Sequence, residues 1–173
     1  WSFQNNSTNF NHNNGTVTQT NAGHIKSLNA NPFYNFIMNS GSSDSHEAVF
    51  RPKTGTDCVI AANDVTVTRG ILKLNTVSNT ASMGSLTIAA NGTYQASSGT
   101  TTLTSESGAG YHIKNDGTFT HNNGTVTITG PTDSHAEIRG FTSSHPLKNL
   151  ILNNATGSSV ETRIVGAIEI EGD

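Results

Sequence analysis

The chain has 173 residues, a length that accommodates one domain with a sizeable core. Asn, Thr and Ser make up 65 of these residues, whereas charged residues are 12% and the formal net charge is −3. Such a low net charge argues against disorder, and nine basic residues spread singly offer no electrostatic footprint for nucleic acid. No apolar run is long enough for a transmembrane helix. Composition therefore favours an ordered, all-β chain.

Short apolar bursts recur along the chain between polar turns, and they predict β-strands. The polar stretch 39–46 and the Asn-Gly and Asp-Gly pairs mark turns between them. The predicted strands are Thr16–Thr20, Ile25–Leu28, Phe33–Met38, Ala48–Arg51, Cys58–Ala61, Val65–Thr68, Ile71–Leu74, Ser85–Ile88, Thr93–Ala96, Thr100–Thr104, Tyr111–Lys114, Thr118–Thr120, Thr125–Thr129, Ala136–Arg139, Leu147–Leu152 and Arg163–Ile170.

A long internal repeat organises the sequence. Phe-Asn-His-Asn-Asn-Gly-Thr-Val-Thr at 10–18 returns as Phe-Thr-His-Asn-Asn-Gly-Thr-Val-Thr at 119–127, and the segment 32–39 returns, less closely, at 146–153. We therefore expect a single domain over 1–173 that belongs to a longer repetitive chain. Its first repeat copy covers about 10–118 and its partial second copy about 119–173.

Two architectures suit many short strands joined by tight turns: a parallel β-helix (β-solenoid) and an antiparallel β-sandwich. Strand number does not separate them. Paired Asn residues that can ladder between coils, uneven turn lengths and unclosed ends favour the parallel β-helix. The antiparallel sandwich is the alternative.

Each repeat copy begins with a turn that feeds a strand. Asn14-Gly15 and Asn123-Gly124 supply residues that tolerate positive φ, and we expect the two glycines to adopt it. His12 and His121 occupy the same place in the two copies. A residue that recurs with the repeat serves the repeat, for example by bonding the turn backbone, and this reading is preferred to a metal or catalytic role.

The motifs Phe-x-His-Asn-Asn-Gly-Thr-Val and Pro-[Phe/Leu]-x-Asn-[Phe/Leu]-x-[Met/Leu]-Asn resemble repeats of large β-solenoid surface proteins, adhesins and phage structural (fibre-like) proteins of marine and gliding bacteria. The resemblance lies in the order and spacing of residues in the repeats, and it covers most of the chain. It implies an extended scaffold that is extracellular, on a cell surface or on a virion. It carries no catalytic residue over to this sequence.

Two similar clusters could bind a cation. Asp44 and His46 in the first cluster correspond to Asp133 and His135 in the second, and nearby carboxylates would suit Ca²⁺. The glycine-rich nonapeptide of calcium-binding solenoids is absent. A solvated loop before a strand is the preferred interpretation, so no cofactor is expected.

Polysaccharide-cleaving β-helices need carboxylates that converge on one face. Asp57 and Asp64 flank a predicted strand, but the sequence brings no further acid or base beside them. Glu169 and Glu171 share a strand face, where mutual repulsion predicts exposure to solvent. The single cysteine, Cys58, is expected to be a small buried apolar side chain. No catalytic residue is predicted.

The ends of the chain suggest its partners. A solenoid coil without a cap exposes backbone groups and core side chains that can bind another chain. We therefore expect Trp1, Phe3, Ile168 and Ile170 to contribute to end-to-end contacts with identical copies or adjoining repeats. The sequence thus favours a non-catalytic structural or adhesive role. A carbohydrate-binding or polysaccharide-cleaving β-helix that contacts surface glycans is the alternative.

Overall fold

The computed structural model describes residues 2–4, 11–26, 32–41, 43–51, 57–74, 80–129, 136–153 and 162–172. No helix in this part of the chain is long and apolar enough to span a membrane. The described regular elements are strands: β1 (Ser2–Gln4), β2 (Thr16–Gln19), β3 (Gly23–Lys26), β4 (Asn35–Asn39), β5 (Glu47–Phe50), β6 (Cys58–Lys73), β7 (Ala81–Gln95), β8 (Thr100–Leu103), β9 (Ile113–Asn115), β10 (Thr118–Thr120), β11 (Thr125–Ile128), β12 (Ala136–Arg139), β13 (Asn149–Leu152) and β14 (Thr162–Val165).

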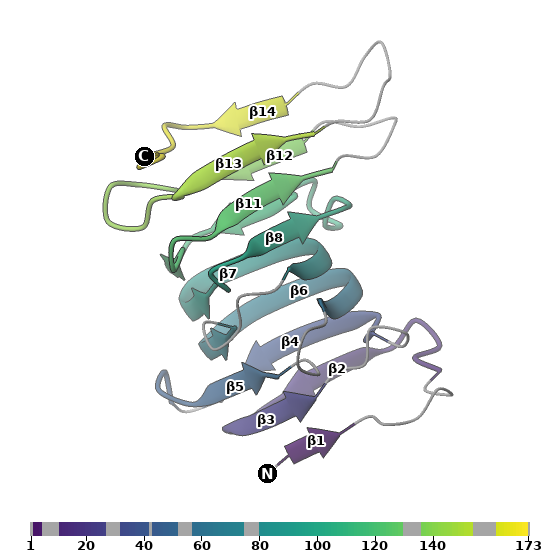
Figure 1. The fold of residues 1–173 in the computed structure, drawn as a ribbon. Coiled ribbons are helices and arrows are strands. Elements are labelled where there is room, and N and C mark those ends of the chain that lie inside the picture. The colour runs from purple at the N-terminus through teal and green to yellow at the C-terminus, as the bar shows by residue number, and fades with distance from the viewer. Residues whose placement is uncertain are drawn as a thin grey trace.

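The strands stack as successive coils of a parallel β-solenoid, with β1 at one end of the stack and β14 at the other (Figure 1). Every strand pair among the described residues is parallel. The prediction of a parallel β-helix is therefore confirmed, and the antiparallel sandwich is wrong. Parallel pairing arises because each strand bonds to the strand one turn later in the chain.

The pairings among the described residues form three ladders along the axis of the stack, and the second of them extends from β2 to β14. The first ladder contains β1, β3, β5, residues 71–73 of β6, residues 93–95 of β7, and β10. The second contains β2, β4, residues 64–69 of β6, residues 85–88 of β7, β9, β12 and β14. The third contains residues 58–61 of β6, residues 81–83 of β7, β8, β11 and β13.

Two strands are much longer than the sequence predicts. β6 and β7 each pass through all three ladders, where separate short strands were expected. Their shared register shifts at the corners, between Val59 and Ala61, Ala61 and Asp64, and Val67 and Arg69. These irregularities bend the strand without ending its pairing, so the polar corner residues do not separate the strands.

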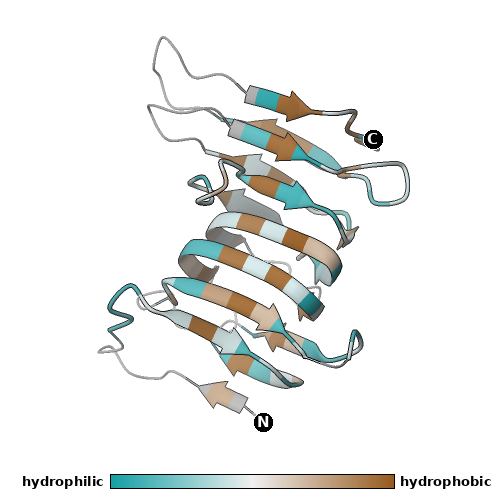
Figure 2. Ribbon diagram, turned by 180° about the vertical axis from the view of Figure 1, so that it is seen from behind, coloured by the Kyte–Doolittle hydropathy of each residue, from teal (hydrophilic) through white to brown (hydrophobic). Residues whose placement is uncertain are grey.

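Side chains of alternate residues enter the core and form columns along the stack. In the third ladder Leu103 pairs with Ile128, and both are fully buried. In the second ladder Ile113 pairs with Ile138, and both are again fully buried. The long strands at the middle of the stack show the corresponding bands of apolar and polar residues (Figure 2). This alternation is the period-2 pattern that the sequence displays.

Aromatic rings fill the core at two levels of the stack. Towards the N-terminal end the rings of Phe36 and Phe50 meet edge to face, with centroids 5.1 Å apart. Further along, Phe119 contacts Tyr94 at 5.8 Å and Phe141 at 5.2 Å. Such contacts add stability beyond that of the buried area alone.

The two sequence copies occupy different ladders. In the first copy the repeated Asn-Gly turn leads into β2 of the second ladder. In the second copy the same turn leads into β11 of the third ladder. The later echo shows the same displacement, because β4 lies in the second ladder and β13 in the third. The copies therefore share local structure but are displaced by one ladder around the coil.

Candidate functional site

The two repeated turns have the same geometry. The N–H of Gly15 donates to the carbonyl of His12 at 2.7 Å, and that of Gly124 donates to His121 at 2.8 Å. Each histidine also accepts a bond at Nδ1, from the N–H of Asn14 at 3.0 Å and from that of Asn123 at 2.9 Å. The prediction that these histidines bond turn backbone is confirmed.

The prediction that Gly15 and Gly124 adopt positive φ is wrong. The asparagines carry it instead, with φ of 45° and 56° at Asn13 and Asn14 and 48° and 62° at Asn122 and Asn123. Positive φ at both central residues is characteristic of a type I′ turn, which asparagine tolerates.

Gly124 is needed for close approach. A β-carbon there would lie 2.4 Å from the carbonyl oxygen of Ser97 and 2.7 Å from that of Gly99. These oxygens belong to the preceding coil, so the turn can pack against it only without a side chain.

Gly124→Ala is expected to lower the free energy of unfolding by about 1–3 kcal/mol, because the methyl group overlaps backbone atoms that cannot move aside. Gly15→Ala is the matched control, since the nearest described atom to a β-carbon there is the His12 oxygen at 3.1 Å. Urea denaturation of both variants measures the difference. Equal losses at the two positions would contradict the close-approach explanation.

The two carboxylates considered for catalysis bind the adjacent coil. The Asp57 carboxylate accepts the N–H of Thr80 at 3.1 Å, and the Asp64 carboxylate accepts the hydroxyl of Ser85 at 2.7 Å. Asp64 belongs to the second ladder, whereas Asp57 precedes the third. Each therefore links two coils on a different part of the surface.

The cation-site candidates do not form a cluster in the described residues. The Asp44 carboxylate accepts a bond from the Arg69 guanidinium at 2.5 Å, and His46 Nδ1 is buried with no bonding partner in this part of the chain. Among the described residues no three His, Cys, Asp or Glu side chains are placed to hold a metal ion. Asp133 and His135 lie outside the described residues.

His112 is a buried histidine that sequence reasoning missed. Its register neighbours place it on the outer face of the second ladder, yet it is 0% exposed. The loop 104–111 folds back here, with the N–H of Ser105 donating to the carbonyl of Gly84 at 3.0 Å. Neither ring nitrogen of His112 has a hydrogen-bond partner among the described residues. Burial lowers the pKa of the imidazole, and the nearby Glu106 carboxylate opposes that shift.

This burial predicts a loss of stability in mild acid. An unfolded histidine has a pKa of about 6.5, so below that pH the unfolded chain binds a proton that folded His112 does not. The contribution of His112 is therefore complete above the unfolded pKa and declines as the pH falls towards the lower folded pKa. Denaturant titrations from neutral to mildly acidic pH measure it.

His112→Phe removes the titrating group and should flatten that part of the pH profile. His24→Gln, which replaces an exposed histidine, is the matched control. A profile that His112→Phe does not alter would contradict the assignment.

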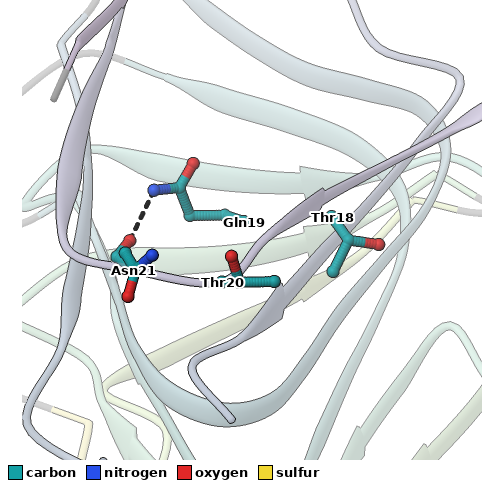
Figure 3. A pocket seen from close by; sticks show the side chains of 4 residues that line it. All are labelled: Thr18, Gln19, Thr20 and Asn21. Carbon is teal, nitrogen blue, oxygen red and sulfur yellow. Dashed lines mark hydrogen bonds between the residues drawn. The ribbon is translucent and has the colours of Figure 1, made fainter.

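A hollow of about 240 Å³ lies beside β2, lined by Thr18, Gln19, Thr20 and Asn21. Figure 3 shows Gln19 turned towards Asn21, to whose carbonyl oxygen its Nε2 donates at 2.5 Å. These lining residues are neutral and include no nucleophile paired with a base. The hollow therefore offers hydrogen bonds but no group suited to catalysis.

A basic and aromatic cluster lies on the outer face of the second ladder. Lys114 Nζ lies 5.9 Å from the centroid of the Tyr111 ring, and Arg139 Nη1 donates to the Tyr111 hydroxyl at 3.4 Å. Lys114 and Arg139 are register partners on adjacent coils. Lys114 also pairs with Asp116 at 2.7 Å. Two cations side by side are unfavourable in a sheet unless an anion approaches them.

The terminal residues differ in exposure. Trp1 lies outside the described residues, and Phe3 is partly buried with its ring 5.5 Å from that of Phe33. Ile168 packs against the core, whereas Ile170 is 43% exposed. The predicted strand Arg163–Ile170 is shorter in the structure: β14 ends at Val165, and after it the described residues contain a single bridge, between Ile170 and Leu147.

Two further expectations are confirmed. Glu169 and Glu171 are exposed, and Glu171 lies 3.5 Å from Nε2 of His121. Cys58 is fully buried, and burial raises the pKa of its thiol to about 12. A thiol in this state is a weak nucleophile.

Comparison with known proteins adds no further evidence. No protein-family model, no curated protein and no solved structure matches this chain.

Proposed function

We propose that this chain is a non-catalytic structural β-solenoid, a segment of an extracellular surface fibre, filament or virion appendage with an adhesive or self-assembling role. The observation that carries the proposal is that Asp57 and Asp64 bond to the coil that follows each of them. Carboxylates engaged in this way hold the coils together and do not converge on a substrate.

Ion pairs between coils support the same role. Lys73 binds Glu47 at 3.0 Å across adjacent strands of the first ladder, and Arg163 binds Glu137 at 3.3 Å across adjacent strands of the second. Each exposed pair contributes little alone, about 0–1 kcal/mol, but the pairs recur along the stack. A rod held in this way is suited to joining identical copies or adjoining repeats end to end.

The proposal is tested by incubating the chain with a panel of bacterial and algal polysaccharides and measuring new reducing ends and unsaturated products. No cleavage is expected. Asp57→Asn and Asp64→Asn should each cost only about 0.5–1.5 kcal/mol of stability, the usual value of one hydrogen bond. Cleavage by the parent chain that is lost in either variant would overturn the proposal.

Glycan binding is a second candidate function, favoured by the cluster of Tyr111, Lys114 and Arg139. An acidic sugar could place its ring on the tyrosine and its carboxylate or sulfate on the arginine fork. Nucleic acid is a poorer fit, because it requires many more cations than this face offers.

Calorimetric titration with a polyuronate and with a neutral glucan tests this second candidate. Binding to the polyuronate should weaken about tenfold in Arg139→Gln, as expected for the loss of one charge-assisted contact. Arg51→Gln alters an exposed arginine elsewhere and should bind like the parent. Equal binding of all three proteins, or none by the parent, would exclude the site.

A further inference from the structure

The outer face of the third ladder carries a regular array of hydroxyl side chains. Thr101 and Val126 point inward and are only 1% and 3% exposed, and the residues on either side of each are partly exposed. Thr80 is placed by its neighbour Ala81, which pairs with Thr101. The outward residues form two columns across successive coils, named here the hydroxyl array: Thr80, Thr100 and Thr125 in one column, and Ser82, Thr102 and Thr127 in the other.

The array repeats in two directions. The pairing of β7 with β8 and that of β8 with β11 show no register shift, whereas the pairing of β6 with β7 shifts at the corners. Neighbours within a column are therefore separated by the strand spacing of about 4.8 Å, and the two columns lie about 6.6 Å apart along each strand. Figure 1 shows β8 and β11 side by side on one face of the stack.

The threonine hydroxyls of the array are available to an outside partner. Thr104 and Thr129, just after the same strands, donate their hydroxyls to the carbonyls of Met83 and Leu103 in the preceding coil. Among the described residues no such bond is found for the array threonines on β8 and β11. A threonine hydroxyl donates one hydrogen bond and accepts two, so each can join a network of water molecules.

The array is also uncharged and contains no aromatic ring. By contrast, the outer face of the first ladder carries Lys73 and Glu47, and that of the second carries Lys114 and Arg139. An acidic ligand would find no cation on the array, and a sugar would find no ring on which to stack. The regular part of the third ladder is thus a neutral surface of hydroxyl and methyl groups.

Ice is a ligand whose own surface repeats in two directions. Its water molecules donate and accept hydrogen bonds at fixed positions, at distances comparable with the two repeats of the array. The threonine methyl groups restrict the orientation of the water beside them, as apolar groups do. A charged side chain would instead keep its own strong hydration shell. Neutrality and regular spacing therefore favour ice over a peptide or a soluble sugar.

We propose that the hydroxyl array of the third ladder adsorbs to the surface of ice, with its hydroxyls in positions of the first water layer. The proposal adds an activity to the structural role and does not depend on that role. The paired strands beneath the array fix its backbone. Threonine is stiff at χ1 because it is branched at the β-carbon, so adsorption orders few side-chain torsions.

Partitioning into growing ice tests the proposal. Ice is grown slowly from a dilute solution of the chain, and the protein in the ice is compared with the protein left in the liquid. The expected result is enrichment in the ice, together with slower recrystallisation of a frozen sample. Thr102→Lys should lower the enrichment at least about tenfold, because its strongly hydrated ammonium stands in the middle of one column. Thr127→Lys gives a second disruption on the next coil.

Thr118→Lys is the matched control. It makes the same change at a threonine that is also partly exposed, on the outer face of the first ladder, and it should partition like the parent. Circular dichroism and urea denaturation verify that each variant is folded.

Exclusion of the parent chain from ice would overturn the proposal, as would equal enrichment of the parent and Thr102→Lys. Binding of the parent to microcrystalline cellulose or chitin, without enrichment in ice, would assign the array to a crystalline polysaccharide instead. None of these results bears on catalysis, so the cleavage assay still judges the proposed function separately.

Discussion

Gly140→Ala is expected to destabilise the protein by more than about 3 kcal/mol, because strain and overlap act together. Gly140 has φ of +87°, where residues with a β-carbon are strained. A β-carbon there would lie 1.8 Å from the carbonyl oxygen of Asn115 and 2.8 Å from its carbonyl carbon. Asn115 belongs to the preceding coil, and its side-chain amide donates to the Gly140 carbonyl at 3.2 Å. The methyl group would therefore separate two coils.

Two other glycines separate strain from overlap. Gly166 has nearly the same φ of +85°, but a β-carbon there would meet no described atom within 4 Å, so Gly166→Ala should cost about 1–2 kcal/mol. Gly108 has neither positive φ nor a close neighbour, so Gly108→Ala should be nearly neutral. Urea denaturation ranks the three variants. Similar losses for Gly140→Ala and Gly166→Ala would show that overlap is unimportant.

Leu103→Ala should cost about 2–5 kcal/mol, the usual range for emptying a buried leucine site. Leu103 is fully buried in a core column of the third ladder. Leu152 belongs to the same column, two coils later, but is 44% exposed. Leu152→Ala should therefore cost less than about 1 kcal/mol in dilute solution, as for other partly exposed positions.

Thermal and urea denaturation of both leucine variants at low protein concentration measures this difference. Both variants replace a leucine of the same core column by alanine, so the two positions differ in burial alone. A large loss in Leu152→Ala under dilute conditions would indicate that the C-terminal coil is covered in the monomer.

The strands could be predicted because their signal is local. Thr125, Thr127 and Val126 alternate as a strand with one buried face requires, and β11 has that pattern of burial. One asparagine-to-asparagine bond joins adjacent coils, from Asn63 Nδ2 to the Asn35 side chain at 3.0 Å, but neither residue belongs to the paired asparagines of the turns, for which laddering was predicted. These features depend on neighbours in sequence or on a chemistry shared by successive coils.

The corners of the coils and the burial of His112 on the outer face of the second ladder could not be predicted in the same way. Nothing local distinguishes a corner that ends a strand from one that bends it, so β6 was expected as three strands. His112 follows Tyr111 and precedes Ile113 in an alternating pattern that predicts exposure. Its burial is a tertiary feature, and the preceding loop 104–111 is itself held by bonds to β7. Gly124 likewise owes its role to oxygens of another coil.

The displacement of the repeat by one ladder means that the recurring unit is a vertex, that is, one corner of the coil with the strand that follows it. The recurring unit is not a whole revolution of the chain around the solenoid. The motif carries its own asparagine pair, histidine acceptor and glycine, so it can turn the chain at more than one vertex of the cross-section. Successive revolutions are then free to differ in length. The second ladder passes from Val65 to Leu86 in one revolution and from Leu86 to Ile113 in the next, which adds the loop 104–111. A chain assembled from vertices can lengthen one side of its cross-section while its interior columns stay in register.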